Sequence, residues 1–277
     1  HKSVLAMLIG VAIRDGHIGS VDDEVGVYLE EWAGDGRGRI SLRDMLQQSS
    51  GIDYPTIGWN PIGGFTQLVL GTDVEPLVLS QPLAEDPGQS FDYNSINPQA
   101  LGIVIERATG MRYADYLSEA LWRHTGADDA EVVLDSIEHG MARTFCCLEA
   151  TARSWMAMGL LHLTEGRFGD RQIVPAGWMR QITTPSRTNP NYGYLTWLGR
   201  EYVEYRSYNQ KASTRAFHSE PFAARDVIYF DGFGGARVYV VPSAGLVIVR
   251  TGDLALDWDD AYLPNLLLRG LRQTRSG

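Results

Sequence analysis

The chain has 277 residues, of which 44% are hydrophobic and 21% are charged, and its formal net charge is −10. These proportions are typical of a globular protein with a large core and exclude a disordered chain. The acidic balance argues against nucleic acid or an anionic membrane as the main partner, because both need a basic face.

The two cysteines, Cys146 and Cys147, are neighbours in the chain. Adjacent cysteines bridge only through a strained geometry, so we expect no disulfide. An unbridged pair leans toward a reducing compartment such as the cytoplasm. The localisation is otherwise undefined by the sequence.

The chain opens with an apolar run from Val4 to Ile13 that no polar side chain interrupts. We predict a helix buried on all sides there, ending at Arg14-Asp15-Gly16. The run is too short to cross a bilayer, which needs about 18 apolar residues. Lys2 lies in the first turn, where desolvation lowers the pKa of an ammonium toward that of a general base. A lysine that merely extends to solvent at the helix end is the alternative.

Capping signals and helical periodicity define the next elements. Residues 40–46 read as a helix with Ser41 as its N-cap. Residues 52–90 are rich in proline and glycine, and we expect a long surface connection of the kind that forms binding walls. Three more helices are predicted from the spacing of apolar residues, over 99–108, 113–122 and 151–165.

After residue 185 the pattern changes to short β-rich runs, at 192–198, 226–230, 237–241 and 246–251. Residues 242–245 read as a hairpin turn, and 258–272 as a helix. The sequence therefore predicts an α+β fold, a two-layer α/β arrangement with an antiparallel sheet flanked by helices beside a mostly helical part. We expect one unit over 1–277, mostly helical at 1–185, with the sheet and C-terminal helix at 186–277.

Two further segments carry side chains suited to chemistry. In Phe91–Ser95 (FDYNS), at a loop-to-helix junction, Tyr93 can point its phenol into a cleft, while Ser95 offers a short polar group. In Phe230–Gly235 (FDGFGG), three glycines allow a backbone N–H to approach a ligand or an oxyanion closely. Each segment has a plain structural alternative, a turn with an N-cap in the first and a hairpin loop in the second.

Taken in order, these segments resemble the serine β-lactamase-like superfamily, in the branch with class C β-lactamases, D-alanyl-D-alanine carboxypeptidases, carboxylesterases and 6-aminohexanoate-dimer hydrolase. Lys2-Ser3 is similar to the end of the family's S-x-x-K motif, and residues 42–51 (LRDMLQQSSG) to its L-R-x-L-L-x-x-x-S-G segment. Phe91–Ser95 resembles its Y-x-N/Y-x-S box. Gly232–Gly235 followed by 238–242 resembles the strand that holds its third motif. The likeness covers nearly the whole chain.

The resemblance implies a serine hydrolase that forms an acyl-enzyme with small esters or linear amides and needs no cofactor. Lys2 and Tyr93 would share the proton of the nucleophilic serine. Ser95 would position Tyr93 or the substrate. At the third motif, Gly232 and the Phe233 N–H would meet the substrate, with that N–H and the N–H of the nucleophile binding the oxyanion.

The sequence departs from the family pattern in two places. The serine of S-x-x-K belongs three positions before Lys2, outside residues 1–277, and Ser3 cannot replace it because it points to another face of the helix. The polypeptide of residues 1–277 is therefore expected to be an inactive fragment, or to be preceded by a residue not written as a standard amino acid. Where relatives carry K-T-G or H-x-G to hold a carboxylate, Phe230-Asp231-Gly232 offers no cation. If Asp231 faces the cleft, it repels such a ligand.

Two other functions stay open at this point. A non-catalytic binding module of the same fold would be favoured by Ala or Gly three positions before Lys2, and a β-lactamase or D-Ala-D-Ala carboxypeptidase differs only in its substrate. His162 and Glu165 are the one histidine pair at helical ligand spacing, and without a third ligand we expect no metal. The expected partner is a small ester or amide, with no nucleic acid and no membrane span. The oligomeric state is not defined by the sequence.

Overall fold

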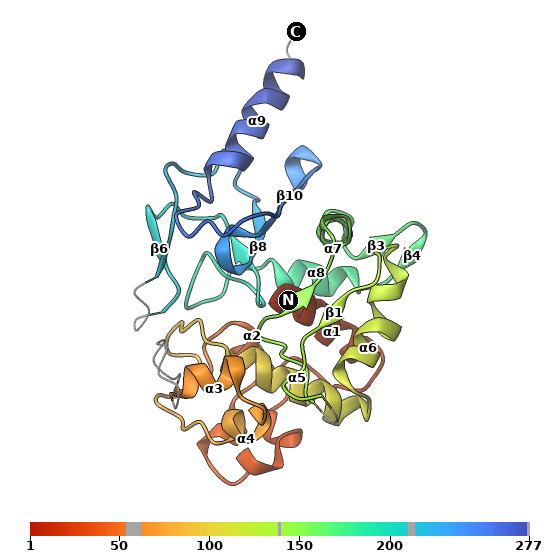
Figure 1. The fold of residues 1–277 in the computed structure, drawn as a ribbon, viewed down its shortest axis with the longest axis vertical. Helices are drawn as coiled ribbons and strands as arrows, with labels where there is room; N and C mark the ends of the chain where they lie inside the picture. Colours follow the sequence, from red (N-terminus) through yellow and green to blue (C-terminus); the bar gives the residue numbers. More distant parts are fainter. Residues whose placement is uncertain (54–62, 138–139, 210–213, 276–277) are drawn as a thin grey trace.

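The computed structural model describes residues 1–53, 63–137, 140–209 and 214–275. Helix α1, Lys2–Arg14, runs through the middle of the molecule (Figure 1), and every residue from Ser3 to Ala12 is buried. Gly16 follows with φ of 79°, a backbone conformation that favours glycine. The predicted buried first helix, ending at Arg14–Gly16, is confirmed.

Three short 3₁₀ helices follow α1 along the chain, η1 at Val25–Val27, η2 at Glu30–Trp32 and η3 at Gly36–Arg39. Helix α2 then covers Leu42–Leu46. The Ser41 side chain accepts from the Asp44 N–H, and the Asp44 carboxylate accepts from the Ser41 N–H. This reciprocal capping box confirms Ser41 as the predicted N-cap.

The prediction of a surface connection over 52–90 is wrong where two short helices form, and 54–62 lie outside the described residues. Helix α3 covers Gly64–Leu70 and helix α4 covers Val74–Leu79. Proline misled the prediction because Pro76 lies in the first turn of α4, where a helix makes no use of the missing N–H.

The central helices follow their predictions closely. Helix α5 covers Ile96–Thr109 and ends at Gly110, whose left-handed conformation caps it. Helix α6 covers Tyr113–Ala120, and the short η4 covers Trp122–His124. Helix α7 covers Ala152–Leu163.

Several elements were not predicted. Helix α8, Ala176–Ile182, is too short to show a clear apolar period. Three two-stranded pairs are also present, β1 (Glu131–Val132) with β2 (Leu148–Glu149), β3 (Arg167–Phe168) with β4 (Arg171–Gln172), and β6 (Tyr205–Ser207) with β7 (Arg215–Phe217).

The main sheet is antiparallel, with strands in the order β10-β9-β8-β5. Its strands are β5 (Trp197–Leu198), β8 (Ile228–Asp231), β9 (Arg237–Val241) and β10 (Leu246–Arg250). Short helices η5 (Phe233–Gly235) and η6 (Pro242–Ala244) join the last three. The predicted strand over 192–198 is mostly wrong, because the chain turns back there, with the Gly193 N–H bound to the Thr196 carbonyl.

The sheet lies between two helices. On one face α7 packs against β9 and β10, where a Cβ on Gly159 would lie only 2.6 Å from Val247 Cγ1. On the other face α9, Tyr262–Arg275, adds Leu268 to an aromatic cluster that includes Trp197 and Tyr239. The end of α9 extends away from the body (Figure 1). Among the described helices, none is long and apolar enough to span a membrane.

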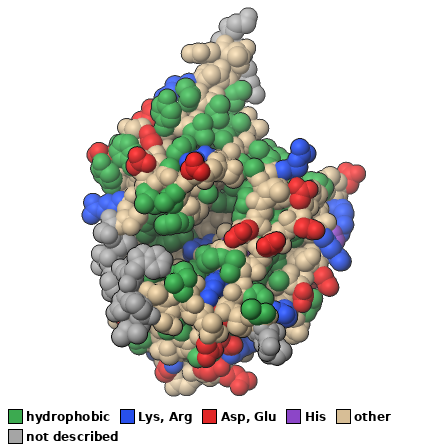
Figure 2. Space-filling view, viewed as in Figure 1, with side chains coloured by type: hydrophobic (Ala, Val, Ile, Leu, Met, Phe, Trp, Pro, Cys, Tyr) green, Lys and Arg blue, Asp and Glu red, His purple; other side chains and the backbone are tan. Residues whose placement is uncertain are grey.

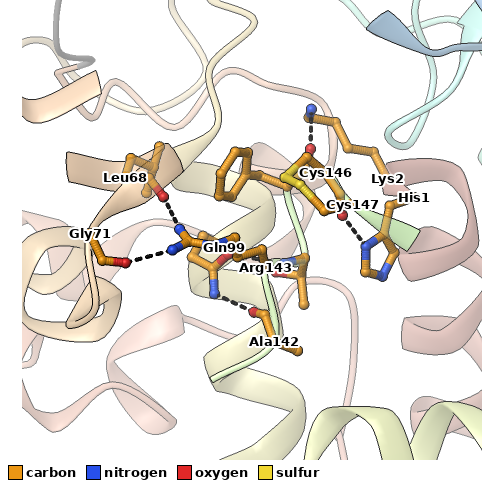
Figure 3. The surroundings of a disulfide bond; sticks show 11 residues. His1, Lys2, Leu68, Gly71, Gln99, Ala142, Arg143, Cys146 and Cys147 are labelled. Carbon is orange, nitrogen blue, oxygen red and sulfur yellow. Dashed lines mark hydrogen bonds between the residues drawn. A yellow bond between two sulfur atoms is a disulfide. The ribbon is translucent and has the colours of Figure 1, made fainter. Parts of the chain in front are cut away.

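The structure joins Cys146 to Cys147 in a disulfide (Figure 3), so the prediction of an unbridged pair is wrong. Cys147 has φ of 63°, a left-handed conformation that residues other than glycine rarely adopt. The chain thus bends at this point to bring two adjacent side chains together. The preference for a reducing compartment rested on the unbridged pair and loses its basis.

Candidate active site

The structure brings Lys2 and Tyr93 together. Lys2 Nζ lies 4.9 Å from the centroid of the Tyr93 ring. The same Nζ donates a hydrogen bond of 2.5 Å to the Phe145 carbonyl, in the segment that carries the disulfide (Figure 3). Figure 2 shows this face of the molecule hollowed between the sheet and the helical part, close to the position of the N-terminus in Figure 1.

Burial shifts the pKa values of Lys2 and Tyr93 in opposite directions. It lowers the pKa of Lys2 to about 8, against the smaller opposing effect of the Asp231 carboxylate. Burial, with the nearby Tyr192 and Asp231, raises the pKa of Tyr93 well above its usual value. Lys2 can therefore take up a proton near neutral pH, while Tyr93 remains a phenol that can donate one.

The loop that carries Tyr93 is held from the helical side by Gln48, which follows α2. The Gln48 side chain donates to the Asn94 carbonyl at 3.1 Å and accepts from the Asn94 N–H at 3.2 Å. It also accepts from the Asn97 amide at 2.8 Å. Gln48 is fully buried and has φ of 58°, a strained conformation for a residue other than glycine. This strain occurs at the residue that holds the Tyr93 loop in place.

The same loop is held from the sheet side by the residues that follow β6. The Tyr93 N–H donates to the Tyr208 carbonyl at 3.2 Å, and the Asn209 amide donates to the Tyr93 carbonyl at 2.9 Å. The Tyr93 ring packs 5.4 Å from the Tyr208 ring and 5.5 Å from the Trp197 ring, centroid to centroid. This segment thus fixes the backbone of Tyr93, and together with Trp197 of β5 it fixes the ring.

The other predicted site residues lie at the starts of α5 and η5. Ser95 is the N-cap residue of α5 and makes no capping hydrogen bond with its side chain. The Gly232 N–H donates to the Ala236 carbonyl at 2.9 Å, which closes the loop after β8. Phe233 follows with 86% of its surface exposed. Since the Gly232 N–H is used inside the loop, the Phe233 N–H is the better candidate for contact with a substrate oxyanion.

Asp231 is buried and ion-paired rather than free to face the cleft. Its carboxylate pairs with Arg206 and, at 2.8 Å, with Arg237, and it accepts from the Tyr208 hydroxyl at 2.8 Å. Arg237 also pairs with Asp260 at 2.6 Å. The repulsion of a ligand carboxylate that was expected if Asp231 faced the cleft does not apply, because two guanidinium groups offset the charge of Asp231.

The sequence analysis missed most of these supporting residues. Arg206, Tyr208 and Asn209 belong to a hairpin that was not predicted, and no motif marks them. Gln48 lies within residues 42–51, which resemble a segment of the family, so the sequence did offer a signal that this residue belongs near the site. The pair of His162 and Glu165 does not form a site, since Glu165 pairs with Arg180. Within the described ranges, no group of three potential ligands could hold a metal.

Comparison with known proteins identifies the family. The sequence model of the Beta-lactamase family matches residues 1–253. The chain belongs to the Beta-lactamase family. The 6-aminohexanoate-dimer hydrolase of Paenarthrobacter ureafaciens is 28% identical over 192 residues, which is 65% of this chain and 48% of that protein. The chain thus spans about half the length of this curated relative.

Solved structures confirm the predicted fold class. A protein from Bacillus anthracis, provisionally assigned as a 6-aminohexanoate-dimer hydrolase, has a TM-score of 0.77 at 19% identity, over 99% of this chain and 71% of its own. An octameric penicillin-binding protein homologue from Pyrococcus abyssi has a TM-score of 0.70 at 16% identity, over 98% of this chain and 64% of its own. A family VIII carboxylesterase has a TM-score of 0.68 at 15% identity, over 96% of this chain and 80% of its own. At these identities the likeness shows the Beta-lactamase fold alone.

Proposed function

We propose that the protein is a serine hydrolase that forms an acyl-enzyme with small esters or linear amides. The contact between Lys2 Nζ and the Tyr93 ring, in a member of the Beta-lactamase family, is the observation that carries the proposal. The Paenarthrobacter relative is by name a hydrolase of the 6-aminohexanoate dimer, which supports a linear amide as one substrate class.

In the proposed reaction the nucleophile is a serine three positions before Lys2, outside residues 1–277. Neutral Lys2 takes the serine proton as the serine oxygen bonds to the substrate carbonyl carbon, and the Phe233 N–H helps to hold the oxyanion. Tyr93 gives its proton to the leaving group as the C–O or C–N bond breaks, and regains one from Lys2. Water then attacks the acyl ester by the same route. Ser95 orients Tyr93 or the substrate.

The third motif supports an uncharged substrate. Phe230 is buried against His162, with ring centroids 5.4 Å apart, and cannot replace the cation that relatives carry at this position. The neighbouring guanidinium groups of Arg206 and Arg237 are already paired with carboxylates. A substrate carboxylate would therefore lose its hydration without gaining a free cation at this motif, whereas an ester or amide has no such cost.

The substrate preference is tested with protein that includes the proposed serine. We expect hydrolysis of p-nitrophenyl butyrate, with kcat/KM for benzylpenicillin at least about tenfold lower, equivalent to ~1.4 kcal/mol of transition-state binding. Lys2→Met is the inactive control. Comparable kcat/KM values for both substrates would contradict the proposed substrate class.

The position of the nucleophile is tested by labelling. A fluorophosphonate probe should label the extended protein once, on the serine three positions before Lys2, and should leave the polypeptide of residues 1–277 unlabelled. An adduct on that shorter polypeptide would place the nucleophile elsewhere. Alanine or glycine at the upstream position would instead favour the non-catalytic binding module.

A further inference from the structure

The segment Phe145–Cys147, which carries the disulfide, lies directly beside the proposed base. Lys2 Nζ donates to the Phe145 carbonyl at 2.5 Å, and Nδ1 of the His1 ring contacts the Cys146 carbonyl (Figure 3). Two consecutive carbonyls of the disulfide segment thus hold the side chains of two consecutive residues at the start of α1. A change in the backbone of this segment therefore changes the surroundings of Lys2.

The chain is fixed on both sides of the disulfide segment. Before it, the Thr144 N–H donates to the Gln99 side chain at 3.0 Å, and the Thr144 hydroxyl donates to the Pro98 carbonyl at 2.7 Å. After it, β2 pairs with β1, and the Val133 N–H donates to the Cys147 carbonyl at 3.0 Å. The two carbonyls that contact residues 1 and 2 lie between these anchors, so a local change at the disulfide moves them first.

The disulfide accounts for an unusual backbone conformation in this segment. Cys147 has φ of 63°, in the left-handed region that residues other than glycine rarely adopt. Such a conformation persists only where the surrounding structure enforces it. The covalent bond between the two adjacent side chains supplies that constraint. Without the bond Cys147 favours negative φ, and the segment relaxes between its two anchors.

Both cysteines are also accessible to a reductant, because each is partly exposed. Exposed disulfides are the ones that exchange readily with other thiols. We propose that the Cys146–Cys147 disulfide is a redox modification site that holds Lys2 in its position for proton transfer. This inference rests on the proposed function, because Lys2 is the base of the proposed reaction.

The modifying reagent is a dithiol. One of its sulfurs attacks a cysteine sulfur as a thiolate, the S–S bond breaks, and a mixed disulfide forms. The second sulfur of the dithiol then displaces the cysteine. The dithiol is oxidised to a cyclic disulfide, its two hydrogens pass to the cysteine sulfurs, and the protein is left with two thiols.

The modification is tested on protein that includes the proposed serine, before and after treatment with dithiothreitol. Thiol titration of the native protein should count two additional thiols after reduction. In protein with isotope-labelled lysine, the NMR signal of the Lys2 ε-carbon, assigned by its absence in Lys2→Met, should shift on reduction. No new thiols, or two new thiols without a shift of this signal, would overturn the inference whether or not the protein hydrolyses esters.

Activity provides a second measurement. For p-nitrophenyl butyrate we expect kcat to fall at least about tenfold on reduction, with a smaller change in KM, and to recover on reoxidation with oxidised glutathione. An active protein that keeps its kcat after complete reduction would contradict the link to Lys2 and leave the proposed function standing. Absence of hydrolysis by the oxidised protein would contradict the proposed function, and the lysine signal would then decide the inference alone.

A matched pair of variants tests whether the disulfide acts through the backbone. Cys146→Ser with Cys147→Gly removes the bond but allows the left-handed conformation, whereas Cys146→Ser with Cys147→Ala removes the bond and disfavours that conformation. The kcat of the glycine variant should exceed that of the alanine variant by about fivefold, and neither should respond to dithiothreitol. Equal kcat in the two folded variants would refute the backbone link, and a response of either to dithiothreitol would place the reducible group elsewhere.

Discussion

Lys2 and Tyr93 show how burial in one place moves the pKa values of two neighbouring groups in opposite directions. Burial disfavours the charged form of each group, which is the ammonium of Lys2 and the phenolate of Tyr93. The amine therefore loses its proton near pH 8, whereas the phenol keeps its proton across the neutral range. With Nζ 4.9 Å from the ring centroid, a base and an acid lie next to each other before any substrate binds.

Tyr93→Phe tests the role of the phenol in protein that includes the proposed serine. We expect kcat for p-nitrophenyl butyrate to fall by roughly 10²–10⁴-fold, the usual contribution of a general acid–base group. The rate should still rise with pH to a plateau with a midpoint near 8, because Lys2 must be neutral to take the serine proton. Steady-state rates across a pH series measure both effects.

Tyr205→Phe serves as the control for this variant, since Tyr205 is also a tyrosine and has 54% of its surface exposed. It should behave as the wild type. A Tyr93→Phe rate within threefold of the wild type would place the proton transfer on another residue.

At the scale of elements, the short strand pair of β6 and β7 holds two separate segments of the candidate site in place. Tyr208 and Asn209, which follow β6, bind the backbone of Tyr93 at its N–H and its carbonyl. Arg206 of the same strand pairs with Asp231 at the end of β8. A hairpin distant in sequence thus links the tyrosine loop to the third motif.

Asn209→Ala tests this link, because it removes the 2.9 Å hydrogen bond to the Tyr93 carbonyl. In the extended protein we expect kcat to fall about tenfold with a smaller change in KM, as expected when a catalytic group is misplaced. The pH midpoint set by Lys2 should not move. Ser207→Ala, at an exposed position at the end of β6, is the control. Equal kcat in both variants would show that the hairpin does not position Tyr93.

At the scale of the whole molecule, the helices and one face of the sheet share a core. A continuous cluster of buried side chains runs from Val4 in α1 to Val238 and Val240 in β9. His162 of α7 is buried in this region, against Phe230 of β8. Neither of its ring nitrogens has a partner among the described residues, and burial lowers its pKa to about 4.

His162 should make the protein sensitive to acid. Between the unfolded value near 6.5 and the folded value of about 4, the unfolded chain binds a proton that the folded protein does not. Lowering the pH through this window should therefore reduce the free energy of unfolding by about 3 kcal/mol. Urea unfolding of the wild type and of His162→Leu across this range measures the effect.

The leucine variant lacks the titrating group and should lose less stability on acidification than the wild type. His17→Leu, at an exposed position, should keep the slope of the wild type. Identical slopes for His162→Leu and the wild type would show that His162 does not titrate differently in the folded and unfolded states.

The sequence by itself determined the long helices, three of the four main strands and the Beta-lactamase fold class. These features depend on local signals, such as the apolar run of α1, the capping box at Ser41 and the β-branched residues of β9 and β10, which act within a few residues. The candidate residues Lys2 and Tyr93 also came from local motifs.

Only the tertiary structure decided which side chains meet. The Asp231 ion pairs, the hold of Asn209 on Tyr93 and the contact of Lys2 with the Phe145 carbonyl join segments far apart in the chain, and one arginine or asparagine in a sequence does not reveal its partner. The short elements α3, α4 and α8 form because tertiary packing outweighs weak local preference. The Cys146–Cys147 disulfide likewise depends on a backbone conformation at Cys147 that composition does not predict.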